Sequence, residues 1–169
     1  TGLGLPVPPG FTITAEACQT CLTHGAEPRD LAREVDEHLA GLEAAVGRTL
    51  GQRDDPLLVA VRSGAKHSMP GMMETVLNIG LNDQSVRGLA AQAGDERFAF
   101  DSYRRLIQMF GQTVLDIDGS HFEQALEAAK QAKGSIDDLS LDAADLRRLV
   151  GQFKEIVVQQ AGRRRSQRR

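Results

Sequence analysis

Apolar residues recur every three or four positions over most of the chain, which is the spacing of amphipathic helices. The clearest case follows Pro28, a residue type favoured in the first turn of a helix. Its apolar positions are Leu31, Val35, Leu39, Leu42 and Val46. The same spacing, with a capping residue such as Thr14 and glycines such as Gly25 and Gly134, predicts further helices. They span about 14–24, 82–93, 96–115, 121–133 and 142–160.

Short apolar runs interrupt this helical pattern and predict strands. Continuous apolar runs bounded by turn residues are typical of buried strands. Such runs lie at 57–61 and 75–81, and a shorter one lies at 11–13. With the helices, they predict an α+β fold, in which an α+β portion at residues 1–82 precedes a helical subdomain at residues 83–161.

The last eight residues, 162–169, differ in kind from the rest of the chain. They contain five arginines and no acidic residue. Such a sequence buries too little apolar surface to fold, which predicts a disordered basic tail. Removing its five arginines from the chain's 20 basic residues leaves 15, against 23 acidic ones. The body is therefore acidic, which argues against nucleic-acid binding.

Two further features limit the class of protein. No apolar run approaches the ~18–20 residues needed to span a bilayer, and no signal peptide pattern opens the chain, so we predict a cytoplasmic protein without a membrane partner. Cys18 and Cys21 form a C-x-x-C pair with His24 nearby. A structural zinc site needs four ligands, and no second pair follows. We therefore interpret the two cysteines as ordinary free thiols.

The loop between the two longer strands carries the candidate chemistry. It opens with Arg62, whose guanidinium supplies a permanent charge and a fork of donors. Gly64 and Gly71 would let backbone N–H groups approach an anion, and Ser63 and Ser68 add hydroxyl donors. The pattern of strand, arginine, small-residue loop and strand therefore predicts a site for phosphate groups.

As a literal string, this region resembles the nucleotide-binding segment of the pyruvate, phosphate dikinase family of ATP-grasp enzymes. The resemblance rests on Met-Pro-Gly-Met-Met at 69–73, followed by Leu-Asn-x-Gly-Leu-Asn at 77–82. It extends to Leu-Pro-Val-Pro-Pro-Gly-Phe at 5–11 and to Asp-Ser-Tyr-Arg-Arg at 101–105, and it covers roughly residues 3–160. The related phosphoenolpyruvate synthases also have a strand ending in arginine and serine but lack the Met-Pro-Gly-Met-Met string.

This resemblance implies the N-terminal part of an ATP-grasp domain with a helical insertion. It also implies a reaction in which ATP, phosphate and pyruvate give AMP, pyrophosphate and phosphoenolpyruvate, with magnesium on the ATP, in a homo-oligomer. In the family, a phosphate-binding lysine precedes this region. The metal ligands, the phosphohistidine domain and the pyruvate barrel follow it. We therefore expect an ATP-binding fragment that is inactive alone, contributes no metal ligand, and depends on absent domains for pyruvate and phosphate.

The resemblance also implies roles for individual residues. Arg62 is expected to contact the nucleotide phosphates and to act as the catalytic residue. Further ATP or phosphate contacts are expected from Ser63, Gly64, Ser68, Met69, Gly71, Met72 and, on the next long helix, Arg105. Arg104 stands beside Arg105, and one of the two should face solvent while the other faces the site or a partner.

Alternatives remain open at this stage. Arg62 could instead pair with Glu74 and pin the loop. We interpret His67 as an exposed loop residue, because the family's phosphorylated histidine lies in another domain. The chain could also belong to a phosphoenolpyruvate synthase-like dikinase, or be a non-catalytic nucleotide-binding or regulatory fragment.

Overall fold

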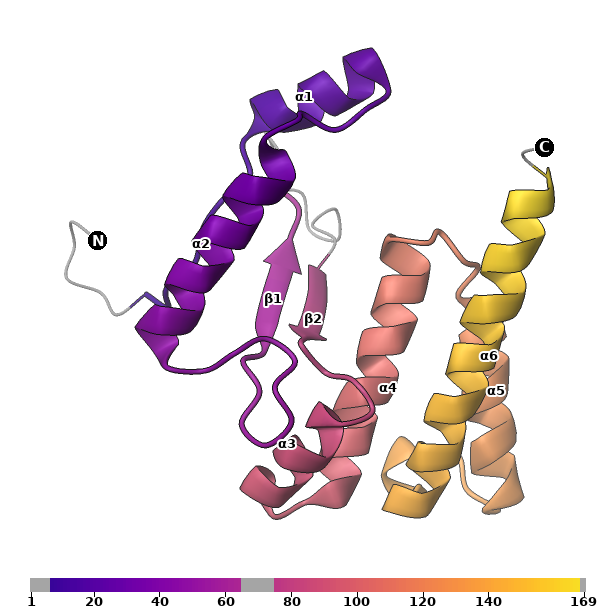
Figure 1. Cartoon of the computed structure of the whole chain (residues 1–169). Coiled ribbons are helices and arrows are strands. Elements are labelled where there is room, and N and C mark those ends of the chain that lie inside the picture. Colours follow the sequence, from indigo (N-terminus) through magenta and orange to yellow (C-terminus); the bar gives the residue numbers. More distant parts are fainter. Residues whose placement is uncertain (1–6, 65–74, 168–169) are drawn as a thin grey trace. The chain divides into compact units, whose positions relative to one another are not determined.

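In the computed structural model, the chain is described over residues 7–64 and 75–167. This part is an α+β structure with a helical majority and a small sheet, so the predicted fold class is confirmed (Figure 1). In chain order the elements are α1 (Ala15–His24), α2 (Leu31–Val46), β1 (Val59–Arg62), β2 (Thr75–Ile79), α3 (Ser85–Ala93), α4 (Glu96–Thr113), α5 (Ser120–Ala132), the 3-10 turn η1 (Asp138–Ser140) and α6 (Ala143–Gln167). No helix in the described ranges is long and apolar enough to cross a bilayer.

The chain divides into two compact units, which meet between Thr49 and Leu50. The sequence predicted a boundary after residue 82, but that position lies inside the second unit. The reason is that β2 packs against α4 and shares its core, to which Val76 of β2 and Tyr103 of α4 both belong. The strands and the C-terminal helices therefore form one body.

The first unit contains α1 and α2, and both of these helices were predicted from the sequence. Gly25 ends α1 in the left-handed conformation (φ 64°), which glycine adopts without steric cost, and its N–H donates to the Cys21 carbonyl at 2.9 Å. The predicted strand at 11–13 is wrong. A strand needs a partner for its backbone groups, and no described segment pairs with this one. Instead, the Phe11 ring stacks on the His38 ring at 5.6 Å.

The second unit contains the sheet, in which β1 and β2 are antiparallel. Both predicted strands are confirmed but are shorter than predicted. The second ends at Ile79, because Gly80 (φ 117°) departs from the extended conformation. The first was predicted to be buried, yet Val61 is 55% exposed.

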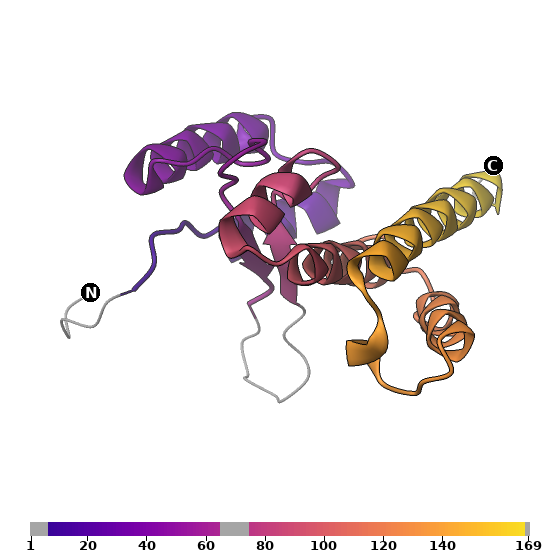
Figure 2. The same cartoon turned by 90° about the horizontal axis from the view of Figure 1, so that it is seen from below.

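A single apolar core joins the sheet to the helices of this unit. Phe122 of α5 and Phe153 of α6 are completely buried and meet edge to face, with ring centroids 5.0 Å apart. Helices α4 and α6 lie side by side, and η1 lies on the connection from α5 to α6 (Figures 1 and 2). The other buried apolar members are Val76, Leu81, Val86, Ala99, Phe100, Tyr103, Leu106, Ile117, Leu141, Leu146, Leu149 and Val150.

Side chains cap the helices of this unit. The Asn82 carboxamide oxygen accepts from the N–H groups of Gln84 at 2.8 Å and Ser85 at 2.9 Å, just before and at the start of α3. At the start of α6, Asp142 and Asp145 accept from each other's backbone N–H in a reciprocal box. A hydrogen bond from Lys133, with the one from Asp145, lowers the pKa of Asp142 to about 2. Asp142 therefore keeps its capping charge well below neutral pH.

Helix α6 continues to Gln167, so residues 162–167 are helical where the sequence predicted a disordered tail. Arginine and glutamine are good helix formers, and extending an existing helix costs far less than nucleating one. These local terms explain why the helix passes the last apolar position of its buried stripe.

We expect Gly88→Ala to destabilise the second unit. A Cβ at Gly88 in α3 would overlap the backbone carbonyl of Arg53 and lie 2.8 Å from that of Asp54, so the helix would have to move. Such overpacking costs about 1–3 kcal/mol. Gly151→Ala in α6 is the matched control, because a Cβ there meets nothing within 4 Å and alanine favours helix by about 0.5–1 kcal/mol. Urea unfolding should shift in opposite directions for the two variants, and a shift in the same direction would contradict this packing.

Candidate functional site

Arg62 is the last residue of β1, where it pairs with Thr75 at the end of the ladder. Arg62 therefore lies at the end of β1 from which the connection between the strands leads. Arg62 is exposed, and no described residue forms an ion pair or hydrogen bond with its side chain. Within residues 7–64 and 75–167, its guanidinium is therefore available to an anion from solution.

The rest of the predicted loop is only partly described. Ser63 and Gly64 follow Arg62 in an exposed segment. A Cβ built at Gly64 would meet nothing within 4 Å, so there is open space beside this backbone. The remaining predicted loop residues lie outside the described residues, as does Glu74, the alternative partner of Arg62. They are Ser68, Met69, Gly71 and Met72.

Arg104 and Arg105 are neighbours on α4 but have different surroundings. The Arg104 side chain is only 4% exposed, and its Nε and Nη2 donate to Asp101 Oδ1 at 2.9 and 2.6 Å. The Arg105 side chain is 60% exposed, and its Nε donates to Asp101 Oδ2 at 2.9 Å. The structure therefore selects Arg105 as the outward-facing arginine of the pair.

The two predicted arginines, Arg62 and Arg105, belong to the same unit. Strand β1 and helix α4 run in the same direction, and α4 packs against β2, the partner of β1 (Figure 1). The Arg62 end of the sheet and the C-terminal half of α4 therefore lie on the same side of the unit. Two exposed guanidinium groups in one unit suit a ligand with several negative charges.

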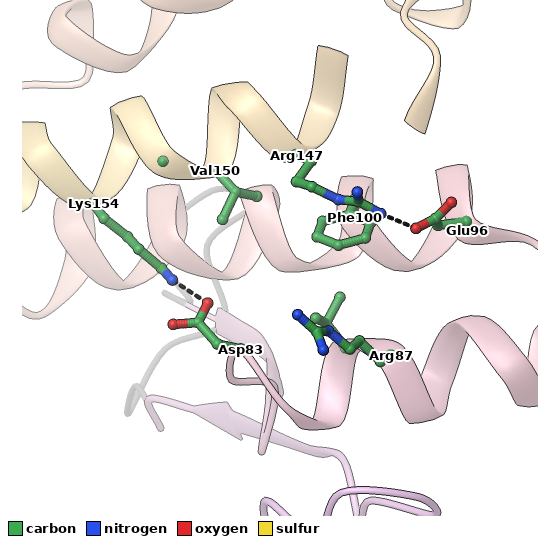
Figure 3. A pocket seen from close by; sticks show the side chains of 9 residues that line it. Asp83, Arg87, Glu96, Phe100, Arg147, Val150 and Lys154 are labelled. Atoms are coloured by element: carbon green, nitrogen blue, oxygen red, sulfur yellow. Dashed lines mark hydrogen bonds and ion pairs between the residues drawn. The ribbon is translucent and has the colours of Figure 1, made fainter. Parts of the chain in front are cut away.

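A second feature, which the sequence did not reveal, is a groove of ≈ 400 Å³ among α3, α4 and α6 (Figure 3). Arg147 pairs with Glu96 and lies over the Phe100 ring at 4.9 Å. Lys154 pairs with Asp83 and lies over the ring of Tyr103. The complete lining is Asp83, Val86, Arg87, Glu96, Phe100, Arg147, Val150, Gly151 and Lys154.

The charges of this groove are mostly satisfied within the chain. Burial would lower the pKa of Lys154, but its hydrogen bonds to Asp83 and Tyr103 raise it overall, so the ammonium stays charged. The two ion pairs join α6 to α4 and to the segment that leaves β2, which is a structural role. Arg87 is the cation lining the groove for which no described residue provides an ion pair. We therefore assign the groove to the packing of α6.

The residues that the structure describes offer no metal centre. None of their His, Cys, Asp and Glu side chains gather in groups of three that could hold a metal ion. Cys18 and Cys21 are free, with Cys18 exposed and Cys21 half-buried. Within the described ranges, the side chains therefore offer no carboxylate cluster that could hold magnesium.

The sequence of the chain matches a class of nucleotide-binding domains. The family model described as "Pyruvate phosphate dikinase, AMP/ATP-binding domain" matches residues 22–138, and the chain belongs to this family. The resemblance inferred from the Met-Pro-Gly-Met-Met string is thereby confirmed.

Curated relatives agree with this assignment. The chain is 52% identical over 161 residues to pyruvate, phosphate dikinase 1, chloroplastic, of Zea mays. It is 50% identical over 164 residues to the pyruvate, phosphate dikinase of Giardia intestinalis and 46% identical over 157 residues to that of Clostridium symbiosum. These matches cover 92–95% of this chain but only 17–18% of the relatives' lengths. The chain therefore spans less than a fifth of the relatives that it matches.

Proposed function

We propose that this chain supplies one wall of the ATP site of a pyruvate, phosphate dikinase. The whole protein would convert ATP, phosphate and pyruvate into AMP, pyrophosphate and phosphoenolpyruvate. The observation that carries the proposal is the family match over residues 22–138, a range that contains the exposed Arg62 at the end of β1. Identity of about half the residues to several named dikinases supports it.

Arg62 is the central residue of this proposal. Its guanidinium donates to oxygens of the ATP phosphates and offsets the charge that develops as a phosphoryl group leaves. Backbone N–H groups of the loop that it heads approach the same phosphates. The other residues that we assign to this contact are Ser63, Gly64, Ser68, Met69, Gly71, Met72 and, on α4, Arg105.

Other parts of the reaction lie outside this chain. ATP would arrive with magnesium, which neutralises phosphate charge when bound, and the metal's protein ligands would come from another part of the longer protein. Pyruvate and phosphate would likewise bind elsewhere, and the whole protein would be a homo-oligomer. We therefore expect the 169-residue chain to bind ATP weakly and to form neither pyrophosphate nor phosphoenolpyruvate.

Titration of the ¹⁵N-labelled 169-residue chain with MgATP tests the proposal. We expect backbone amide signals of Arg62, Ser63 and Gly64 to shift, because N–H groups near this strand end would meet the phosphates. Adenosine at the same concentration is the control and should leave these signals in place, since it carries no phosphate. Shifts confined to the groove around Arg87 and Arg147, or no shift at all, would contradict the proposed site.

A further inference from the structure

Helix α4 carries a network of hydrogen-bonded side chains that the expected ATP contacts do not explain. Gln108 accepts from Arg104 Nη1 at 3.3 Å, Arg104 donates twice to Asp101 Oδ1, and Asp101 Oδ2 accepts from Arg105 Nε. These hydrogen bonds therefore connect a buried arginine, through one carboxylate, to an exposed arginine. Both carboxylate oxygens are occupied, each by a different guanidinium.

The buried end of this network makes Asp101 a fixed acceptor. Arg104 is 4% exposed, and the Asp101 side chain is 18% exposed, so neither can rotate freely into solvent. An isolated Arg–carboxylate pair four residues apart on a helix surface is weak and adopts several geometries. Here the carboxylate is already held by two hydrogen bonds from Arg104, so its second oxygen has a defined position. Arg105 therefore meets an anchored partner.

The atom through which Arg105 binds Asp101 determines which of its other N–H groups stay available to a ligand. Asp101 takes the Nε–H, and no described residue bonds to Nη1 or Nη2. A guanidinium held at Nε keeps its outer edge, formed by the two Nη atoms, for a bidentate contact with a phosphate. The carboxylate does not cancel this attraction, because Arg104 already neutralises it and the three groups together carry one positive charge.

We propose that Asp101 is a positioning residue, which orients the guanidinium of Arg105 so that its Nη edge meets a phosphate of ATP. This inference rests on the proposed function. It assigns Asp101 no contact with the nucleotide, because its oxygens are used by the two arginines. It also explains why an exposed arginine, which would otherwise lose side-chain freedom on binding, can act as a preorganised fork.

A double-mutant cycle tests this role through the preference for arginine over lysine at position 105. Lysine offers a point charge without a fork, so Arg105→Lys should weaken MgATP binding about tenfold in the parent. With Asp101→Asn, the amide oxygen can still accept from Arg104, but the amide NH₂ faces the Nε–H donor of Arg105. The Arg105 guanidinium is then no longer held in one orientation, and Arg105→Lys should weaken MgATP binding by about threefold or less. Repulsion between Asp101 and phosphate affects both side chains alike and cancels in this ratio.

The control uses an Arg–carboxylate pair with the same spacing in the first unit. Arg33 donates to Glu37 at 2.7 Å on exposed α2, so Glu37→Gln removes a similar pair without touching Asp101. In that background Arg105→Lys should still cost about tenfold. If the cost is the same with Asp101→Asn as in the parent, Asp101 does not orient Arg105 and the inference is wrong.

A measurement on the unmutated chain covers the case in which Asp101→Asn fails to fold. The Nε–H of Arg105 should exchange with solvent more slowly than that of Arg87, which has no ion pair with a described residue. Equal exchange rates would overturn the inference. If Arg105→Lys has no effect in the parent while Arg62, Ser63 and Gly64 respond to MgATP, the inference fails and the proposed function stands. Absence of any MgATP response would overturn both.

Discussion

Replacing Arg62 with alanine is expected to weaken ATP binding ten- to hundredfold. The loss corresponds to one charge-assisted contact with phosphate, about 1.5–3 kcal/mol. Arg62→Lys should recover little of it, because an ammonium cannot reproduce the planar fork of the guanidinium. Titration calorimetry or NMR titration of the three proteins with MgATP gives the affinities directly. The fold should be unaffected, since Arg62 is exposed and has no ion pair with a described residue.

Arg53→Ala is the control for the charge itself. Arg53 belongs to the same unit and is exposed, and its Nε lies 3.8 Å from Asp54 Oδ1. Since both residues are arginines, Arg53→Ala and Arg62→Ala change the net charge by the same amount. We expect it to change the ATP affinity by less than about twofold, because an exposed charge away from the ligand is screened by salt. If both Arg62 variants bind ATP like the parent, Arg62 only stabilises the loop, and its assignment to the ATP site is wrong.

Phe153→Ala is expected to destabilise the second unit by about 3–5 kcal/mol, the usual cost of removing a buried aromatic ring. Phe153 is completely buried and meets the equally buried Phe122 edge to face. Its removal forfeits this contact and leaves a cavity between α5 and α6. Urea unfolding followed by circular dichroism measures the loss.

The control for this variant is Val158→Ala on the same helix. Val158 is 72% exposed, so its truncation should change the free energy of unfolding by no more than about 0.5 kcal/mol. Both residues lie on α6, and both changes replace an apolar side chain with alanine, so helix propensity differs little. Equal effects of the two substitutions would show that α6 does not pack on α5 as described.

The helices could be predicted from the sequence because their signals are local. An apolar period of three to four residues, with a capping residue before it and a glycine after it, located α1 and α2 to within a few residues. A strand is different, since its stability depends on a partner elsewhere in the chain. The segment at 11–13 has the composition of a strand but no described partner, and so it forms none.

The candidate site divides in the same way. Arg62 could be found because a strand, an arginine and a small-residue loop are adjacent in sequence. The groove could not, because its ion pairs join Asp83 to Lys154 and Glu96 to Arg147, residues 71 and 51 positions apart. The burial of Arg104 had an available signal, since it follows the apolar Phe100 by four residues and therefore shares its helix face.

The packing of α6 also has a consequence for the synthesis of the chain. The range matched by the family model ends at residue 138, whereas α6, which begins at Ala143, supplies Leu146, Leu149, Val150 and Phe153 to the core. Until these residues leave the ribosome, the apolar faces of α4 and α5 stay uncovered, a state that favours binding by chaperones. Expression of residues 22–138 alone would leave these faces without α6, so a fragment made for experiments should extend at least to Phe153.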